Sequence, residues 1–182
     1  MLVRINAGLL PPDHWAHQNG GRIVGEFCHF VDWARAVAAS PIRKISAVGL
    51  PDGVQYHGDN LAVTLSFADG SVASLAYLAN GSKAMNKEYF EVFCEGGVAR
   101  LDDFRTLELY RGKTEQKFKA AQDKGHKREV QLTIEAMAGG KPAPIPFSEL
   151  AEVTEATFLA LDAARSGQCL ALGPDTEGIP VP

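Results

Sequence analysis

The sequence predicts an α+β fold, with a mostly antiparallel, open sheet and helices packed on one face of it. The first observation behind this prediction is a central region, residues 42 to about 119, in which hydrophobic and polar residues alternate as in strands. The second is that segments with helical periodicity stand before and after this region. Runs of strands flanked by helices are typical of α+β proteins.

The length of the chain indicates one domain. A chain of 182 residues is close to the usual length of one domain, and a hydrophobic content of 46% is ample for a core. We expect this domain to span residues 1–172. A tail rich in proline and glycine is expected at residues 173–182.

The N-terminal segment predicts a strand, a loop and a helix, in that order. Residues 2–7 alternate as in a short strand, and residues 9–19 form a loop with prolines. A helix of about 14 residues is expected from Glu26 onward, and Ser40-Pro41 ends it. Its core-facing stripe is made of Phe27, Phe30, Val31, Ala34 and Ala38.

The central region divides at its turn residues. Residues 61–67 and 72–78 alternate and are joined by Asp69-Gly70, which is a strong hairpin signal. Further short strands are expected at residues 89–94, 98–101, 106–110 and 115–119, with turns at Gly96-Gly97 and Gly112.

Two helices are expected after the strands, at residues 127–138 and 148–166. The segment from Asp123 to Glu129 is dense in charge, which favours a solvated first turn with Asp123 as a candidate cap. The inner stripe of the second helix is expected to be Leu150, Val153, Ala156, Thr157, Ala160 and Ala164.

One face of the expected sheet has no helix to cover it, because a single layer of helices cannot cover both sides of a large sheet. The stretch from Leu61 to Ala79 carries one charge, Asp69, which sits in the turn. This face is either solvated or paired with a second copy of the chain, and the scarcity of charge favours a homo-oligomer joined sheet to sheet. The small side chains expected there are Thr64, Ser66, Ala73, Ser74 and Ala76.

Composition argues against several classes of protein. The net charge is −4 and the basic residues are scattered, so neither nucleic acid nor an anionic membrane is an expected partner. The three cysteines (Cys28, Cys94 and Cys169) are far apart and odd in number, which favours a reducing, cytoplasmic compartment over a disulfide framework. The first residues lack the pattern of a signal peptide, and no apolar run is long enough to span a bilayer.

The segment from Gly20 to Trp33 places ionisable side chains at helical spacing directly after a pair of glycines. His29 and Asp32 lie about 60° apart around a helix axis, on the side away from the apolar stripe. They form either a solvated ion pair on a helix surface or the reactive groups of a site. Glu26 is either an acid stabilised by the helix dipole or a further member of that site.

Gly20, Gly21, Ile23, His29 and Asp32 match a motif that runs roughly G-G-G-x-hydrophobic-x-D-x-x-x-H-x-x-D. The chain therefore resembles the C-terminal domain of the glucose-fructose oxidoreductase and inositol dehydrogenase family. Short matches continue along nearly the whole chain and resemble a branch of that family associated with sugar-nucleotide or exopolysaccharide metabolism. They are Arg4-Ile5-Asn6-Ala7-Gly8, Pro12-Asp13-His14-Trp15, Asp69-Gly70-Ser71, Lys87-Glu88, Asp102-Asp103-Phe104 and Asp123-Lys124-Gly125-His126.

The resemblance implies the substrate-binding and oligomerisation half of an oxidoreductase that uses NAD or NADP and acts on a sugar, a cyclitol or a sugar nucleotide. It implies that His29 accepts a proton and that Asp32 orients it or holds a substrate hydroxyl. Glu26 is a candidate substitute for an aspartate of the family. The side chains implied for the substrate cleft are Arg4, Asn6, His14 and Trp15, the last as a ring on which a sugar stacks.

Two departures from the family limit what the chain can do alone. Gly25 stands where the family has an aspartate, four residues before His29. No G-x-G turn occurs, so the nucleotide-binding (Rossmann) domain of the family is missing, together with the active-site lysine that it carries. We therefore expect this chain by itself to bind no NAD or NADP. The alternative is a non-catalytic sugar-binding or dimerisation module that has lost its redox domain, and Gly25 favours it.

Two other patterns are weaker. His14 and His17 together with His29 are one way to build a metal hydrolase site, but a histidine pair in a loop is weak support and we expect no metal. Lys87 and Glu88 are expected to form or support a surface ion pair, or to be edge charges that discourage strand pairing.

Overall fold

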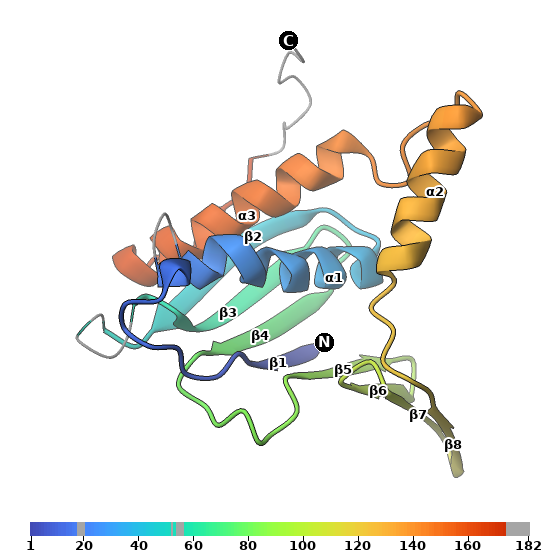
Figure 1. Ribbon diagram of the computed structural model, residues 1–182, viewed down its shortest axis with the longest axis horizontal. Coiled ribbons are helices and arrows are strands. Elements are labelled where there is room, and N and C mark those ends of the chain that lie inside the picture. Colours follow the sequence, from blue (N-terminus) through green and yellow to red (C-terminus); the bar gives the residue numbers. More distant parts are fainter. Residues whose placement is uncertain (18–20, 52, 54–56, 174–182) are drawn as a thin grey trace.

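The computed structural model describes residues 1–17, 21–51, 53 and 57–173 (Figure 1). Among these residues the strands form one nine-stranded sheet in the order β8-β7-β6-β5-β1-β4-β3-β2-β9. In chain order the elements are β1 (Leu2–Asn6), η1 (Trp15–His17), η2 (Ile23–Phe27), α1 (Cys28–Ala38), β2 (Ile42–Gly49), β3 (Asn60–Phe67), β4 (Val72–Leu78), β5 (Glu88–Cys94), β6 (Gly97–Asp102), β7 (Thr106–Arg111), β8 (Thr114–Lys119), α2 (His126–Ala138), α3 (Phe147–Ser166) and β9 (Leu170–Ala171).

Every pair of neighbouring strands is antiparallel except β1 and β4, which are parallel. This arrangement confirms the predicted α+β class and the mostly antiparallel sheet. β1 lies between β4 and β5, and the N-terminal ammonium donates a hydrogen bond to the carbonyl oxygen of Val72 at 2.7 Å. The first strand therefore joins the two halves of the sheet.

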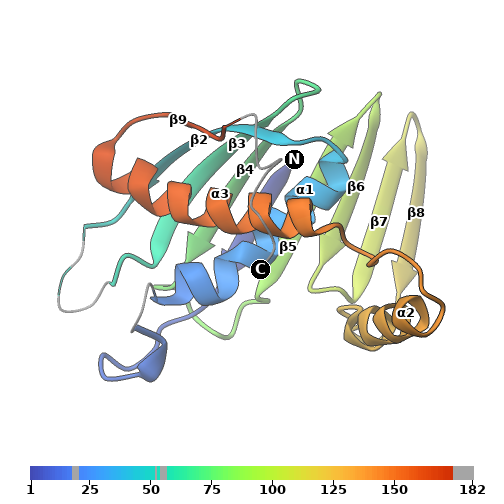
Figure 2. The same ribbon diagram turned by 90° about the horizontal axis from the view of Figure 1, so that it is seen from above.

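The helices α1 and α3 lie together on one face of the sheet, and the opposite face carries no helix (Figures 1 and 2). The core fills the space between this helix layer and the sheet. In β3 the alternate residues Leu61, Val63, Leu65 and Phe67 are buried under the helices, because successive strand side chains point to opposite faces. Phe27 and Val31 are fully buried on the helix side.

Strands β6, β7 and β8 extend beyond α1 and α3 as a wing of the sheet, with α2 beside it (Figure 2). Every residue of β8 is exposed, and β6 is half-buried along its whole length. None of the described helices is long and apolar enough to cross a membrane.

The predicted helices and strands after residue 60 agree with the observed ones to within one residue at either end. Two burial predictions were wrong. Ala73 belongs to the covered face of the sheet, where it is fully buried, and Leu150 is 45% exposed rather than part of the inner stripe of α3. Glu152 and Ala163 are buried in that helix instead. The predicted tail falls outside the described residues from residue 174 on.

A buried ion pair links the two layers of the fold. The guanidinium Nε of Arg35 on α1 lies 3.2 Å from both carboxylate oxygens of Glu152 on α3. Glu152 also accepts a hydrogen bond from the backbone N–H of Ile42, at the start of β2. One carboxylate therefore holds two helices and a strand together where all three are shielded from water.

Replacing Glu152 by Ala is expected to lower the free energy of unfolding by about 3 kcal/mol, because it leaves a buried guanidinium and a backbone N–H without their partner. Urea denaturation followed by circular dichroism measures this. Glu155→Ala on the same helix is the matched control. The double variant Arg35→Met/Glu152→Leu should recover most of the loss, and equal losses for the single and double variants would contradict this account.

Candidate functional site

The helix that carries the motif begins at Gly21, five residues earlier than predicted. Its second turn, η2, is a π-helix that continues directly into α1. Gly21 has φ +62°, a left-handed conformation that favours glycine, whereas Gly20 lies outside the described residues. A π-helical turn contains more residues than an α-helical one and is frequent at functional sites. Angles computed for a regular helix therefore do not hold for Glu26.

A pocket of about 620 Å³ lies between the first turns of this helix and the loop that carries η1. His29 and Glu26 line it from the helix, and Trp15 lines it from the loop. A Cβ atom added to Gly25 would meet no atom within 4 Å, so the pocket has free space where the family's aspartate would stand. The remaining lining residues are Leu10, Ala16, Gly21, Arg22 and Val24.

Glu26 points from the helix to the sheet. Its carboxylate accepts hydrogen bonds from the hydroxyl of Tyr77 on β4 and from the ammonium of Lys87. Partial burial opposes its ionisation, but these hydrogen bonds and the nearby charges of Lys87 and Arg22 outweigh the burial and hold the pKa of Glu26 below its ordinary value. Burial, and then Glu26 itself, raise the pKa of Tyr77. Glu26 is thus an ionised carboxylate bound across two layers, which the helix dipole alone does not explain.

Arg22 fixes the backbone around this carboxylate. The side chain is buried, and its guanidinium donates hydrogen bonds of 2.7 Å each to the carbonyl oxygens of Ala7 and Gly8. It also lies 3.8 Å from Glu26 and 4.0 Å from Asp59. The Arg22 guanidinium therefore contacts the backbone just after β1, the carboxylate of Glu26 on the helix and the carboxylate of Asp59.

Asn6 holds the loop between β4 and β5, which carries Lys87. Its backbone N–H donates to the carbonyl oxygen of Lys87 at 2.7 Å, and its side-chain amide donates to the carbonyl oxygens of Ser82 and Met85. Gly81 packs so closely that a Cβ atom there would lie 2.0 Å from the Asn6 carbonyl oxygen Oδ1. Asn6 is buried and is not among the residues that line the pocket, and its hydrogen bonds hold this loop in place.

Lys87 and Glu88 do not pair with each other, contrary to the surface ion pair expected from the sequence. Lys87 reaches Glu26, and Glu88 is buried and accepts a hydrogen bond from Lys124 at 2.8 Å. Lys87 lies in the loop before β5, whereas Glu88 is the first residue of the strand, and each side chain has a different partner of opposite charge.

His29 and Asp32 form neither a hydrogen bond nor an ion pair with each other in the described chain. His29 lines the pocket, and the structure gives its ring no hydrogen-bond partner among the described residues. Burial raises the pKa of Asp32, Glu149 and Glu129 add to this, and His29 opposes it. Arg35 also opposes the rise in the pKa of Asp32, and among the described residues no cation forms an ion pair with this carboxyl.

The remaining candidate residues are divided between the two faces of the sheet. Trp15 stands at the pocket with 76% of its surface exposed, and its ring contacts that of His14, with 5.5 Å between the centroids. His14 Nδ1 accepts a hydrogen bond from the backbone N–H of Ala16, which shapes η1. Arg4 lies on the uncovered face, over the ring of Tyr89 and bonded to the carbonyl oxygen of Asn86. The structure therefore brings Trp15, Glu26 and His29 together and leaves Arg4 outside the pocket.

Sequence reasoning missed three residues of this cluster: Arg22, Tyr77 and Lys87. A charged residue inside a glycine-rich turn and a tyrosine at a core-facing strand position are signals of a buried polar network. Neither signal identifies the partner, because Tyr77 and Lys87 are 51 and 61 residues from Glu26 along the chain.

Histidines gather near the pocket without forming a ligand set. The rings of His17 and His57 are tilted against each other, with 4.0 Å between their centroids. The ring centroids of His14 and His17 are 6.3 Å apart. The described residues contain no group of three or more histidine, cysteine or acidic side chains arranged to hold a metal ion.

Comparison with known proteins finds similar solved structures but no similar sequence. No protein-family model and no curated protein sequence matches the chain. Aldose-aldose oxidoreductase from Caulobacter crescentus, solved with glycerol, matches 94% of the chain with a TM-score of 0.76 at 17% identity. UDP-N-acetylglucosamine 3-dehydrogenase from Acidithiobacillus ferrooxidans matches 91% with a TM-score of 0.73 at 17% identity.

An oxidoreductase from Agrobacterium radiobacter, solved with NAD⁺, L-tartaric acid and magnesium, matches 94% of the chain with a TM-score of 0.75 at 13% identity. The chain spans 55%, 54% and 56% of these three proteins, so it corresponds to little more than half of each. At these identities the likeness establishes the fold. It confirms the fold expected from the resemblance to the C-terminal domain of glucose-fructose oxidoreductase-type enzymes.

Replacing Lys87 by Met is expected to raise the pKa of Glu26, because the substitution removes both a hydrogen bond to the carboxylate and a positive charge beside it. A pH titration of the Glu26 side-chain carbon by NMR measures the shift. Lys44→Met, on β2, is the matched control and should leave the pKa of Glu26 unchanged.

The same substitution should change stability in one pH range. A carboxyl whose folded-state pKa is depressed stabilises the fold fully above the unfolded-state pKa, about 4.3 for Glu, and this contribution is lost as the pH falls through the folded-state value. Lys87→Met should therefore reduce the free energy of unfolding at neutral pH, and the difference from the unsubstituted protein should shrink under acid conditions. A difference independent of pH would contradict the electrostatic account.

Proposed function

We propose that this chain is the substrate-binding and oligomerisation half of an NAD(P)-dependent oxidoreductase that acts on a sugar, a cyclitol or a sugar nucleotide. The observation that carries the proposal is the pocket lined by a histidine that has no hydrogen-bond partner among the described residues, by a carboxylate bonded to Tyr77, and by an exposed tryptophan. The fold supports it, because solved proteins of this fold include an aldose-aldose oxidoreductase and a sugar-nucleotide dehydrogenase.

The roles of the pocket residues follow from their surroundings. His29 would take the proton of a substrate hydroxyl while the carbon that bears it is oxidised, since a neutral imidazole is suited to proton transfer near neutral pH. Trp15 would supply a flat apolar surface for the sugar ring. Glu26 already accepts hydrogen bonds from Tyr77 and Lys87, so it is better suited to joining the helix to the sheet beside the pocket than to proton transfer.

The described residues do not fit a dinucleotide. The one parallel pair of strands, β1 and β4, is not joined by a strand–turn–helix unit, and the sequence lacks the glycine turn that cradles a pyrophosphate. The nicotinamide would therefore be held by a separate nucleotide-binding domain. The chemistry proposed for this chain is limited to substrate binding and proton transfer.

The alternative is a non-catalytic module that binds sugars or dimerises. The free space beside Gly25 favours it, because nothing in the pocket replaces the carboxylate that the family places there. The two functions differ in whether His29 affects a reaction or only binding.

In the enzyme formed by this chain and its nucleotide-binding domain, His29→Ala is expected to lower kcat about 100-fold or more, the scale of a lost general base. Steady-state kinetics with NAD(P)⁺ and a panel of aldoses, cyclitols and sugar nucleotides measures it, with the exposed His126→Ala as the control. An unchanged kcat would remove His29 from the mechanism.

The chain alone is expected to show no affinity for NAD or NADP by calorimetry, and a Kd below about 10 μM would contradict the proposal.

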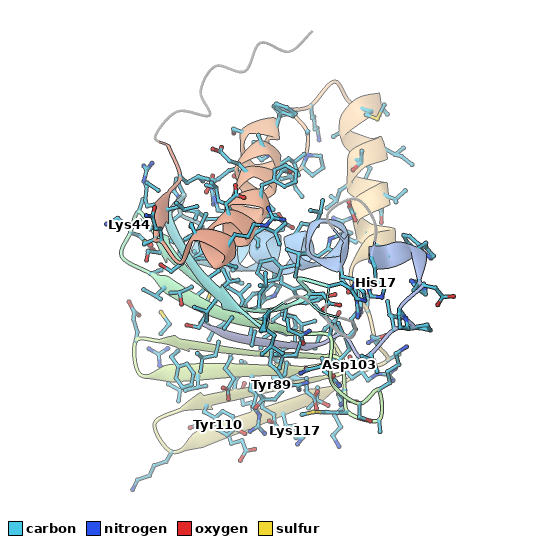
Figure 3. All side chains as sticks on the ribbon, turned by 90° about the vertical axis from the view of Figure 1, so that its left-hand side faces the viewer. His17, Lys44, Tyr89, Asp103, Tyr110 and Lys117 are labelled. Carbon is cyan, nitrogen blue, oxygen red and sulfur yellow. The ribbon has the colours of Figure 1, made fainter. Side chains whose placement is uncertain are left out.

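The open face of the sheet supports the proposal of a homodimer. The large apolar side chains Leu2, Val48, Val72 and Phe93 are exposed on this face, beside the small ones of β3 and β4. A shallow trough of about 830 Å³ runs across it. On the wing, Glu108 is buried between Arg100 and Lys117, and Figure 3 shows Tyr89, Tyr110 and Lys117 on the strands well away from the helices.

Ser66→Arg or Ala76→Arg is expected to convert this dimer into monomer, because a long charged side chain prevents two sheets from approaching to about 10 Å. Light scattering at micromolar concentration measures the mass. Thr154→Arg, an exposed position on α3, is the matched control and should leave the dimer intact. A mass near 19.5 kDa for the unsubstituted chain would contradict the homodimer.

A further inference from the structure

The loop that carries η1 is shaped mainly by its own hydrogen bonds. None of the three residues of η1 is buried, and Trp15 leaves 76% of its surface exposed. The hydrogen bonds that the structure gives to residues 11–17 all lie within the loop. Figure 2 shows the loop projecting from the fold at the end where the helix that contains η2 begins. The turn that carries Trp15 therefore needs a further contact to fix its place against the rest of the molecule.

His17, the last residue of η1, makes such a contact with His57. The centroids of the two rings are 4.0 Å apart, and the ring planes are tilted by 31°. Nε2 of His17 donates a hydrogen bond to the carbonyl oxygen of Pro11 at 3.0 Å, because a carbonyl oxygen can only accept. This bond fixes the orientation in which the ring of His17 meets that of His57.

The contact between the two rings is one of packing. Nδ1 of His17 and Nε2 of His57 are buried and have no hydrogen-bond partner among the described residues. Flat rings at this separation attract each other through their faces and exclude water from between them. Because no hydrogen bond joins the rings, a flat ring without nitrogen atoms should serve as well as the imidazole of His57.

His57 is held by the charged network beside the candidate pocket. Its backbone N–H donates a hydrogen bond to the carboxylate of Asp59 at 3.3 Å. Asp59 is buried, accepts a second hydrogen bond from the side-chain amide of Asn60 at 3.0 Å, and lies 4.0 Å from the guanidinium of Arg22. A ring that packs on His57 is therefore attached to the same network that holds Glu26.

Trp15 and His17 serve two different pockets from one short turn. Trp15 lines the candidate pocket of about 620 Å³, whereas His17 and His57 line a second pocket of about 300 Å³. Gly21, at the start of the helix, lines both pockets. Residues two positions apart in a 3₁₀ turn point to different sides of it, because such a turn has three residues. The turn therefore presents Trp15 to the candidate pocket while His17 attaches it on another side.

We propose that the contact between His17 and His57 positions Trp15 as the sugar-stacking wall of the candidate pocket, an inference that rests on the proposed function. His17 and His57 are positioning residues, since they act on the sugar through Trp15. Without the contact, the turn keeps its internal hydrogen bonds but loses this attachment to the fold. An indole that is already in place when the sugar arrives binds it at a lower entropic cost than a mobile one.

The mobility of the Trp15 indole in the 182-residue chain tests the attachment independently of the proposed function. His57→Ala, and likewise His17→Ala, is expected to lower the NMR order parameter of the Trp15 indole N–H. The indole of Trp33, whose ring centroid lies 4.5 Å from that of Phe90 in the core, should be unchanged and shows that each variant is folded.

His57→Phe should keep the Trp15 indole ordered, because a phenyl ring offers the same packing surface. His126→Ala, at an exposed position of α2, is the control and should change nothing. An ordered Trp15 in both alanine variants overturns the proposal. An equal loss of order in His57→Phe and His57→Ala also overturns it, because the imidazole nitrogens would then be required.

The second test uses the enzyme formed by this chain and its nucleotide-binding domain, with whichever aldose, cyclitol or sugar nucleotide it oxidises. His57→Ala should raise the KM for that substrate about 10-fold and leave kcat within about twofold, because binding and not proton transfer is affected. His57→Phe should restore the KM. In a Trp15→Ala background, His57→Ala should have no further effect, since the positioning acts through Trp15.

The possible failures of the two proposals are distinguishable. Additive losses of Trp15→Ala and His57→Ala, or a fall in kcat at unchanged KM, overturn the positioning role and leave the proposed function intact. Absence of activity with every substrate of the panel overturns the proposed function and the role of Trp15 in binding a substrate. The order parameters then still decide whether His57 fixes the place of Trp15.

Discussion

The fold is governed by a mismatch between one sheet and the helices that cover it. Nine strands present far more surface than α1 and α3 can bury, so the core of the described residues forms under those two helices. The Arg35–Glu152 pair fastens the helices to each other and to β2 where the covering is complete. Everything that this layer leaves exposed, namely the open face, the wing and α2, is available for contact with other molecules or domains.

The candidate site lies at the end of the covered region, where β1, the π-helical turn and the loop before β5 come together. Its charges compensate one another: Glu26 balances Lys87, and Arg22 is held between carbonyl oxygens and two carboxylates. Such a network is rigid because each group would lose hydrogen bonds if it moved. His29 lines the pocket next to this network and forms no hydrogen bond with it in the part of the chain that the structure describes.

Near the start of α2, at the other end of the molecule from the pocket, strained backbone lies next to exposed apolar side chains. The left-handed residues Asp103 and Phe104 and the buried Glu88–Lys124 pair hold the root of α2, while the body of that helix packs against little of the described chain. The fold thus leaves three separate surfaces exposed: the pocket, the open face of the sheet, and the apolar side chains of α2 and the first turn of α3.

The sequence by itself determined the class of the fold and the limits of nearly every element after residue 60, because periodicity and turn residues act over a few neighbouring positions. Tertiary structure alone decided the parallel place of β1, the partners of Glu26 and the separation of Lys87 from Glu88. Tertiary structure also decided that Asn6 and Arg4 lie outside the pocket lining, and that His29 and Asp32 form no hydrogen bond or ion pair with each other among the described residues. These features depend on contacts between residues far apart in the chain and on a π-helical turn, and no local pattern encodes either of them.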